Sequence, residues 1–284
     1  MSGTCIYCGG PGSSREHVWP KWIRDHAKNV MGVDPDNVQE YRGNRQRRGS
    51  LPRDTTEKKG HSRLSLVIRH PCVRCNSEWL SQLEMAASPI LTPMIEGSDR
   101  NLSYLDARII RTWATKTAMH IAYASERGFT YPIPDRLAGE LYAGRADIAP
   151  VRHVKVWVAK YSPLGQFAYR HMAAQGYGVI PTNGEVHQVI RVIFIAGHTI
   201  FYVRMPDDAS AQPLAWRDPL PAFRALHSVR DGEIVPWSGD TLTDAGVSHA
   251  MNRHIHAEIY PGEDLGVWSG LKTSAPPPRP PHMP

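Results

Sequence analysis

Two stretches decide the fold of this sequence: Cys5-Ile6-Tyr7-Cys8 and Cys72-Val73-Arg74-Cys75, which together hold all four cysteines of the 284 residues. Two residues between cysteines let both sulfurs reach one ion of tetrahedral preference, and two such pairs supply the four thiolates of a closed structural zinc site. Gly9 and Gly10 follow the first pair and suit a tight turn that presents backbone amides to sulfur. The spacing therefore predicts a structural Zn²⁺ on Cys5, Cys8, Cys72 and Cys75.

Other uses of the four cysteines stay open as alternatives. Disulfides are disfavoured in the cytoplasm, and two unrelated pairs of buried thiols would leave the spacing unexplained. A thioredoxin-like redox site would use one pair at the start of a helix and would not account for the second pair. Iron can bind the same four thiolates, because ligand type restricts the metal without deciding it.

A second motif lies between the cysteine pairs. It reads Arg15-Glu16-His17-Val18-Trp19-Pro20, and Asn76 follows the last cysteine directly. An acidic residue, a histidine and a nearby proline, with CxxC before and CxxCN after, resemble the HNH or ββα-metal nuclease superfamily. The likeness is greatest to the subgroup in which four cysteines bind structural zinc, and it covers about a third of the chain.

The resemblance implies a fold and a set of site residues. In that family the first part of the motif lies on a β-hairpin, the second opens a helix, and zinc holds these pieces around one catalytic ion. Glu16 then corresponds to the acidic ligand of a catalytic Mg²⁺ or Mn²⁺, His17 to the general base, and Asn76 to the second ligand or positioning amide. The residue types suit this chemistry, because a neutral imidazole can activate water and a hard cation prefers oxygen ligands. Since adjacent strand residues point to opposite faces, we expect a local irregularity at Glu16-His17.

The sequence departs from the family pattern in three respects. The acid is Glu where the family often has Asp, and the insertion between His17 and Cys72 is long. The third histidine of many relatives has no counterpart one turn after Asn76, where Leu80 stands. His61 or His70 are candidates to complete the site, and Glu78 and Glu84 are weaker ones.

Simpler roles for the same residues remain in view. Asn76 could serve only as a helix N-cap, a common position for Asn. A Glu-His pair taken alone is more often an accident of the surface than a catalytic centre. Three tryptophans near the motif are expected in the core, although one beside a nuclease groove could stack on a base: Trp19, Trp22 and Trp79.

The charge distribution suggests a polyanionic partner. The formal net charge is +6 and the isoelectric point is about 9.2, a mild bias toward binding phosphates. Basic residues gather between positions 42 and 63, in a segment without clear periodicity that we interpret as a long loop. Candidate nucleic-acid contacts are Arg42, Arg45, Arg47, Arg48, Lys58 and Lys59, with Arg53 and Arg63 nearby. A solvated loop without ligand is the alternative.

Periodicity predicts the remaining elements. We expect a strand over 64–68, a helix from Asn76 with a break or kink near its end at Pro89 and Pro93, and a helix over 102–125 capped by Ser103 or the polar residues before it. A shorter helix over 135–144 and an antiparallel meander follow, with strands near 154–158, 189–195 and 199–203. The last two strands flank a tight turn at 196–198.

The predicted fold class is α+β, in three parts. Residues 1–98 form a zinc-stapled ββα-metal nuclease domain, residues 99–268 a second α+β domain with a helix and an antiparallel sheet, and residues 269–284 a Pro-rich disordered tail. The second domain carries no motif of its own, and we assign it to specificity, homodimerisation or regulation. The spacing of His249, His254, His256 and Glu258 does not match a zinc site.

The function predicted from these patterns is metal-dependent endonucleolytic hydrolysis of phosphodiester bonds in DNA, with restriction, phage defence or a mobile element as the setting by analogy. A noncatalytic zinc module that binds nucleic acid and an RNA-directed nuclease are the alternatives. No apolar run approaches the length of a membrane span and the amino terminus lacks a secretory segment, so we expect a cytoplasmic protein without a membrane partner.

Overall fold

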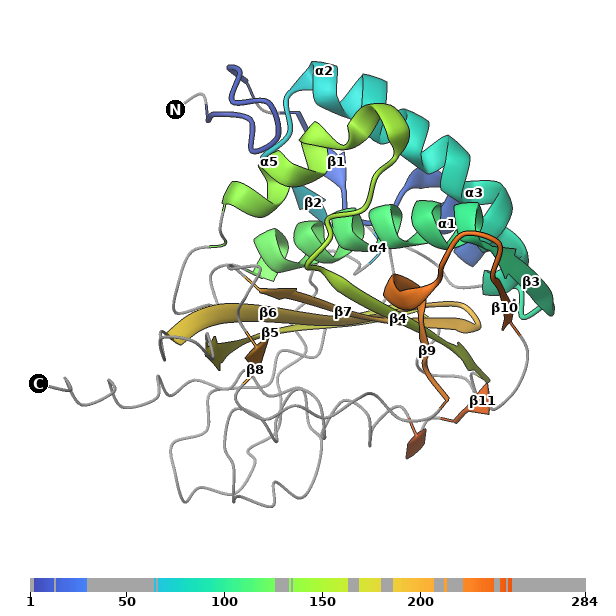
Figure 1. The fold of residues 1–284 in the computed structure, drawn as a ribbon. Helices are drawn as coiled ribbons and strands as arrows, with labels where there is room; N and C mark the ends of the chain where they lie inside the picture. Colours follow the sequence, from blue (N-terminus) through green and yellow to red (C-terminus); the bar gives the residue numbers. More distant parts are fainter. Residues whose placement is uncertain are drawn as a thin grey trace, which may run out of the picture.

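A mixed α+β fold, as predicted, is seen in the computed structural model. The structure describes residues 3–12, 14–29, 64, 66–125, 133, 135–162, 169–179, 186–206, 212–213, 222–237, 241–243 and 245–246. One helix, α4 (Tyr104–Ser125), runs across one face of a mainly antiparallel sheet. Further helices lie on the side of α4 that faces away from the sheet (Figure 1). The basic segment 42–63, His61, the four-residue group His249 to Glu258 and the tail 269–284 lie outside the described residues.

The amino-terminal elements follow in the order strand, strand, helix. β1 (Glu16–His17) pairs antiparallel with β2 (Val67–Ile68). α1 (Lys21–Asn29) directly follows Pro20, whose carbonyl accepts the amides of Ile23 and Arg24 at 3.1 and 3.2 Å. The strand expected within 64–68 is seen as Val67–Ile68. Glu16 and His17 pair one to one with Ile68 and Val67, so the irregularity that we expected there was wrong.

A continuous helical run follows the second cysteine pair. It consists of α2 (Val73–Cys75), a π-helical turn η2 (Asn76–Leu80) and α3 (Ser81–Ile95). The run begins before Asn76, and the N-cap is Cys72, whose sulfur accepts the amide of Cys75. Asn76 has helical backbone angles, so the interpretation of Asn76 as an N-cap was wrong.

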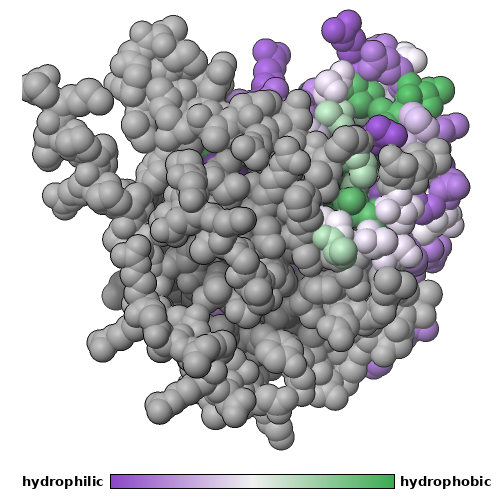
Figure 2. All heavy atoms as spheres, turned by 90° about the horizontal axis from the view of Figure 1, so that it is seen from below, coloured by the Kyte–Doolittle hydropathy of each residue, from purple (hydrophilic) through white to green (hydrophobic). Residues whose placement is uncertain are grey.

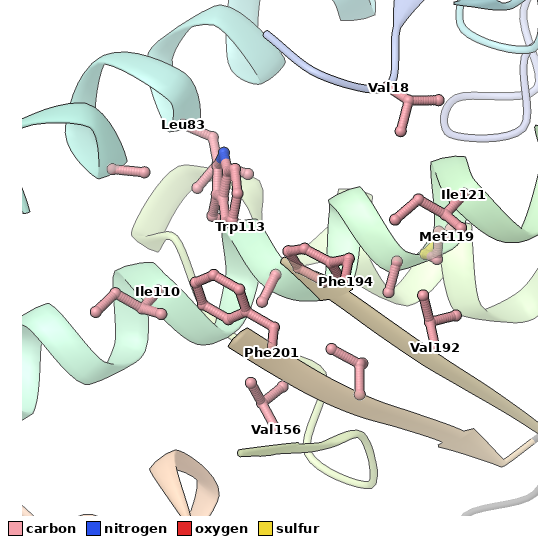
Figure 3. Close-up of a cluster of buried hydrophobic side chains, with 14 of the residues drawn as sticks. Val18, Leu83, Ile110, Trp113, Met119, Ile121, Val156, Val192, Phe194 and Phe201 are labelled. Atoms are coloured by element: carbon pink, nitrogen blue, oxygen red, sulfur yellow. The ribbon is translucent and has the colours of Figure 1, made fainter. Parts of the chain in front are cut away.

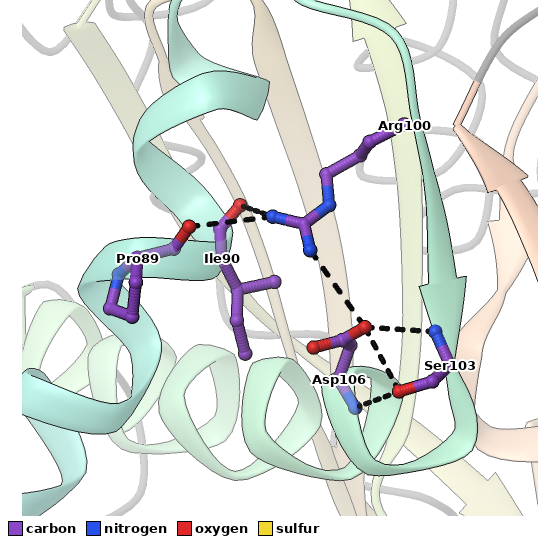
Figure 4. Close-up of polar contacts among 5 residues, drawn as sticks. All are labelled: Pro89, Ile90, Arg100, Ser103 and Asp106. Carbon is purple, nitrogen blue, oxygen red and sulfur yellow. Dashed lines mark hydrogen bonds and ion pairs between the residues drawn. The ribbon is translucent and has the colours of Figure 1, made fainter.

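α3 continues through Pro89 and Pro93 and ends at Ile95, so neither proline breaks the helix at its own position. Pro93 has no N–H, so the carbonyl of Pro89, four residues earlier, lacks its helical donor. The Arg100 guanidinium supplies one: Nη1 lies 2.8 Å from the carbonyl oxygen of Ile90 and 3.4 Å from that of Pro89 (Figure 4). Its other terminal nitrogen lies 3.8 Å from Asp106. A side chain from outside the helix thus donates hydrogen bonds to helix carbonyls at the point where the proline removes a backbone donor.

The start of α4 is fixed by its cap. Ser103 Oγ accepts the amide of Asp106 at 3.1 Å and Asp106 accepts the amide of Ser103 at 2.9 Å, a reciprocal capping arrangement (Figure 4). The predicted cap at Ser103 is confirmed. The predicted start at residue 102 was wrong, because Leu102 belongs to β3 (Arg100–Ser103), which pairs with β10 (Ile234–Trp237).

The sheet contains the predicted meander. β5 (Tyr169–Val179), β6 (Val186–Ala196) and β7 (Thr199–Pro206) pair antiparallel in succession, and β4 (Lys155–Tyr161) continues the sheet beside β7. β8 (Gln212–Pro213), β9 (Arg224–Ala225) and β11 (Thr241–Leu242) add short pairings, with β11 parallel to β4. The predicted helix near 135–144 is α5 (Asp135–Ala143), which is followed by a short helix, η4 (Arg145–Asp147); η5 (Leu226–Ser228) lies beside β4.

Side chains on the two faces of the sheet enter different clusters, as alternation requires. Val192, Phe194 and Phe201 belong to the core under α4, whereas Ile193 and Tyr202 belong to a second cluster. Seen from below, the described part of the surface carries hydrophilic side chains with small hydrophobic groups between them (Figure 2). None of the described helices combines the length and the apolarity that a membrane span requires.

One contiguous core joins the first 98 residues to the rest. Trp113 of α4 lies between Leu83 of α3 and the sheet residues Phe194 and Phe201, at ring-centroid distances of 6.0 and 5.6 Å from these two phenylalanines (Figure 3). The end of α3 also rests on the β6–β7 turn, because the amide of His198 donates to the carbonyl of Ile95 at 2.9 Å. The candidate site is therefore built on a helix that α4 and the sheet support from below.

Candidate metal centre and adjoining polar site

Four sulfurs converge at the amino-terminal edge of the molecule. The Sγ atoms of Cys5, Cys8, Cys72 and Cys75 all lie within 4.8 Å of one another, and those of Cys8 and Cys72 are 3.7 Å apart. Tetrahedral Zn²⁺ with bonds of about 2.3 Å requires sulfurs about 3.8 Å apart. Among the described residues, this is the one group of three or more His, Cys, Asp or Glu side chains that is close enough to bind a metal ion. The four cysteines can therefore bind an ion such as zinc, as the spacing predicted.

Backbone amides point at this cluster. The amide of Cys72 donates to Cys5 Sγ at 3.2 Å and that of Cys75 to Cys72 Sγ at 3.4 Å. Burial raises the pKa of the Cys5 thiol, but hydrogen bonds from the backbone at Cys8, Cys72 and Tyr7 outweigh it and lower the pKa to about 7. Burial raises the pKa of Cys72 and Cys75. Four thiolates this close repel one another, so full ionisation of the set needs a cation, and the amide donors suit a metal-bound set.

The cysteine cluster brings the predicted acid and amide together. Asn76 follows Cys75 and its side-chain amide donates to Ser14 Oγ at 3.1 Å. The same amide lies close enough to Glu16 to act on its carboxylate as a hydrogen-bond donor, which lowers the pKa of Glu16. Glu16 is held by β1, whose partner β2 runs into the second cysteine pair through His70 and Pro71. Two residues sixty positions apart in the sequence therefore meet beside the metal centre.

A buried ion pair lies next to Glu16. The Lys116 ammonium of α4, fully buried, makes a close ion pair with Glu84 of α3, whose side chain is 14% exposed. The other carboxylate oxygen of Glu84 accepts hydrogen bonds from the indole nitrogens of Trp22 at 2.9 Å and Trp113 at 2.8 Å. Burial raises the pKa of Glu16, Lys116 opposes that rise, and the Glu84 carboxylate adds to it.

His17 has the protonation state of a candidate base. Burial lowers its pKa first, and repulsion from Arg24 and Arg15 lowers it further. The imidazole is therefore neutral at pH 7. Its Nδ1 atom is buried and has no hydrogen-bond partner among the described residues. A buried ring nitrogen of this kind calls for an explanation, and a ligand or water at the site is one.

The first cysteine knuckle is anchored to α4. The Tyr7 hydroxyl and His120 Nε2 form a buried hydrogen bond of 2.7 Å. His70, a candidate third site residue, packs its ring on Tyr123 with 4.5 Å between centroids. Trp19 and Trp79 are buried, as predicted, and Trp22 is partly buried against the same core.

Sequence reasoning did not find Lys116 or Ser14 as neighbours of the site, and it ranked Glu84 low. One signal was available for Lys116: it is the one Lys or Arg in the mainly apolar stretch 112–125, and a buried cation needs a buried partner. Leu80 is buried, so the helix offers no third ligand one turn after Asn76. Glu78 is exposed and pairs with Arg74 at 3.8 Å. The roles assigned to Glu16, His17 and Asn76 stay predictions.

Comparison with known proteins adds no assignment: no family model, no curated protein and no solved structure matches this chain.

Proposed function

We propose that this protein is an HNH-type endonuclease that hydrolyses phosphodiester bonds in DNA with one catalytic divalent metal. The observation that carries the proposal is the contact between Glu16 and Asn76 beside the four-cysteine cluster. An HNH-like site requires Glu16 and Asn76 to lie close together. If the two were unrelated surface residues, nothing would bring them together. The π-helical turn that starts at Asn76 is a further supporting feature, because such turns are frequent at functional sites.

His17 is the group that would activate water. A general base must accept a proton at the working pH, and the lowered pKa keeps the imidazole neutral there. Arg15 and Arg24 lie close enough to repel a proton on the ring, and they would also attract a phosphodiester anion. The same two cations can thus favour both the neutral base and the substrate.

Glu16 and Asn76 would hold the catalytic ion. Their carboxylate and amide oxygens are the donors that Mg²⁺ and Mn²⁺ prefer. Ser14 Oγ accepts from the Asn76 nitrogen, which orients the amide and leaves its oxygen for a ligand. When bound, a divalent ion would neutralise charge on the phosphate and stabilise the leaving oxygen.

One observation favours a second candidate, a noncatalytic zinc module that binds nucleic acid. Lys116 lies near the Glu16 carboxylate and already opposes its charge, as a structural partner would. In this alternative Glu16 and Asn76 fix the hairpin to the helix and need no further ion. RNA remains an alternative substrate of the nuclease, and the settings of restriction, phage defence or a mobile element remain proposals by analogy.

The test is nicking of supercoiled plasmid by the full chain in Mg²⁺ or Mn²⁺, with a structured RNA in parallel. We expect His17→Ala to lose at least about a hundredfold in rate, because general-base catalysis contributes that much. Glu16→Gln should lose activity and divalent-ion dependence together. Glu78→Gln, an exposed glutamate on the same helical run, is the matched control and should nick as the wild type does.

Zinc content and thermal unfolding of every variant separate catalysis from folding. Loss of nicking in His17→Ala with unchanged zinc supports the nuclease. Equal nicking by wild type and His17→Ala, or duplex binding without cleavage under any divalent ion, would remove the catalytic assignment in favour of the binding module.

A further inference from the structure

A cationic pocket lies on a part of α4 that the candidate nuclease site does not use. It has a volume of about 450 Å³ and is formed by the first half of α4, the segment before β4 and the short helix η5. The lining residues are Tyr104, Arg108, Arg111, Ala149, Pro150, Arg152 and His227. Arg111 and Lys116 are five residues apart on α4, which turns their side chains about 140° away from each other. Arg111 on one side of α4 lines the pocket, and Lys116 on another side of the same helix faces the Glu16 site.

The charge of this pocket is not balanced by its own walls. Three arginines line it, and among the described residues that form the lining none carries a carboxylate. Arg108 donates one N–H group to the backbone carbonyl of Asp147 at 2.9 Å. Its guanidinium has further N–H groups that can donate to a ligand. Nε of Arg111 is buried and has no hydrogen-bond partner among the described residues. A buried unsatisfied guanidinium nitrogen in a cationic pocket indicates a missing acceptor.

The pKa values of groups in the pocket reflect the same excess of positive charge. Burial lowers the pKa of Arg111 and repulsion from Arg108 lowers it further, although Tyr104 opposes the shift. Burial and repulsion from Lys155, Arg111 and Arg204 lower the pKa of His227 to about 4, although its hydrogen bond to the Val156 carbonyl opposes this. An anion bound here would relieve this repulsion, so the pocket favours a ligand with at least one negative charge.

The size and the rings of the pocket narrow the ligand class. Planar guanidinium groups match phosphate oxygens in geometry as well as charge. The volume exceeds what a single phosphate group needs and falls in the range of small-molecule sites. Tyr104 and His227 supply two rings, and aromatic side chains can stack on a base.

We propose that this pocket binds a nucleotide unit, with the phosphate on Arg108, Arg111 and Arg152 and the base against Tyr104 and His227. The unit is either a free nucleotide or one nucleotide of a single strand. The proposal does not depend on the nuclease assignment, and His17→Ala should bind as the wild type does.

Calorimetric titration of the full chain without added divalent ions tests the proposal, with AMP, inorganic phosphate and a thymidine oligonucleotide of about ten residues as probes. Each arginine-phosphate contact contributes enough that Arg111→Gln should weaken AMP binding about tenfold or more. Arg152→Gln, at an exposed position, should weaken it as well and does not disturb the core. Arg74→Gln, the same charge change on the distant α2, should leave AMP binding unchanged.

The arms of the experiment identify the source of the nucleotide. Oligonucleotide binding that AMP competes away assigns the pocket to a strand, whereas AMP binding without oligonucleotide binding assigns it to a free nucleotide. An upward shift of the His227 pKa on AMP addition, followed by NMR, supports either source. The proposal fails if AMP does not bind, if Arg111→Gln and Arg152→Gln both bind AMP like the wild type, or if inorganic phosphate binds as tightly as AMP.

Discussion

The ion pair between Lys116 and Glu84 offers a sharp test of how the site is supported. We expect Lys116→Met to destabilise the protein strongly, because it removes a fully buried ammonium that balances the charge of a carboxylate that is itself 14% exposed. Methionine has a similar length and fills the same space, so the change in packing is small. The two indole hydrogen bonds to Glu84 remain, but they are neutral donors and do not balance its charge.

The size of the effect follows from the burial of the pair. Removing one member of a buried ion pair costs about 3–5 kcal/mol, because the other charge is left without compensation. Neutralising both members should cost less than the sum of the two single changes. In Lys116→Met/Glu84→Gln the glutamine oxygen can still accept from Trp22 and Trp113, and we expect a coupling energy of about 2 kcal/mol.

Urea unfolding followed by tryptophan fluorescence measures these free energies, since Trp22 and Trp113 flank the pair. Lys21→Met is the matched control: Lys21 also pairs with a carboxylate, Asp25, but its side chain is 80% exposed, and it should cost about 0.5 kcal/mol or less. A loss under about 1 kcal/mol for Lys116→Met, or strict additivity in the double variant, would refute the reasoning that the pair is a buried charge balance.

Three further outcomes can be measured. Cys72→Ser should abolish zinc binding, measured as zinc per chain, and unfold the cysteine region, because structural zinc contributes on the order of 10 kcal/mol to small zinc folds. Glu16→Gln should stabilise the protein at pH 7 in the absence of added divalent ions. Burial raises the pKa of Glu16 above 4.5, so the folded state binds this proton more tightly than the unfolded chain, and its contribution to stability is lost as pH rises through the folded pKa. The gain should vanish below about pH 4 in denaturation series, and Glu78→Gln should show none. Gly197→Ala should cost about 2–4 kcal/mol in unfolding experiments, because its φ is +54° and a Cβ would lie 2.4 Å from a carbonyl oxygen at the end of α3. Gly232→Ala, at φ +82° but in open space, should cost only about 1 kcal/mol.

The cysteine cluster was predictable because the spacing of cysteines within each pair is a local feature of the sequence. A CxxC pair fixes two sulfurs on one short turn, so two pairs can meet only in a few ways. The helix over 135–144 and the strands around the turn at Gly197 were predictable for a similar reason, since periodicity and turn residues act over a few positions. The proximity of Asn76 to Glu16 came from the resemblance, not from periodicity.

The sequence could not reveal features that depend on distant partners. By local rules Pro89 and Pro93 predict a break or kink, but Arg100 supplies donors to the helix carbonyls from outside the helix. Likewise, the partner of Lys116 is set by how α3 crosses α4, and no periodicity encodes that crossing. Leu102 satisfies the apolar pattern of the following helix, yet its backbone pairs with Val235 of β10, far along the chain, and no local pattern encodes that pairing.

The charge balance around Glu16 bears on the choice between the two proposed functions. Lys116 is committed to Glu84 by direct contact, and the neutral side-chain amide of Asn76 also favours the charged form of the Glu16 carboxylate. Two carboxylates thus share one buried ammonium, with Arg24 as a further, weaker influence on Glu16. A purely structural role would favour a neutral residue at position 16, because an incompletely balanced carboxylate costs stability. A divalent cation held by Glu16 and Asn76 would supply the missing charge, which is why we favour the nuclease over the noncatalytic module.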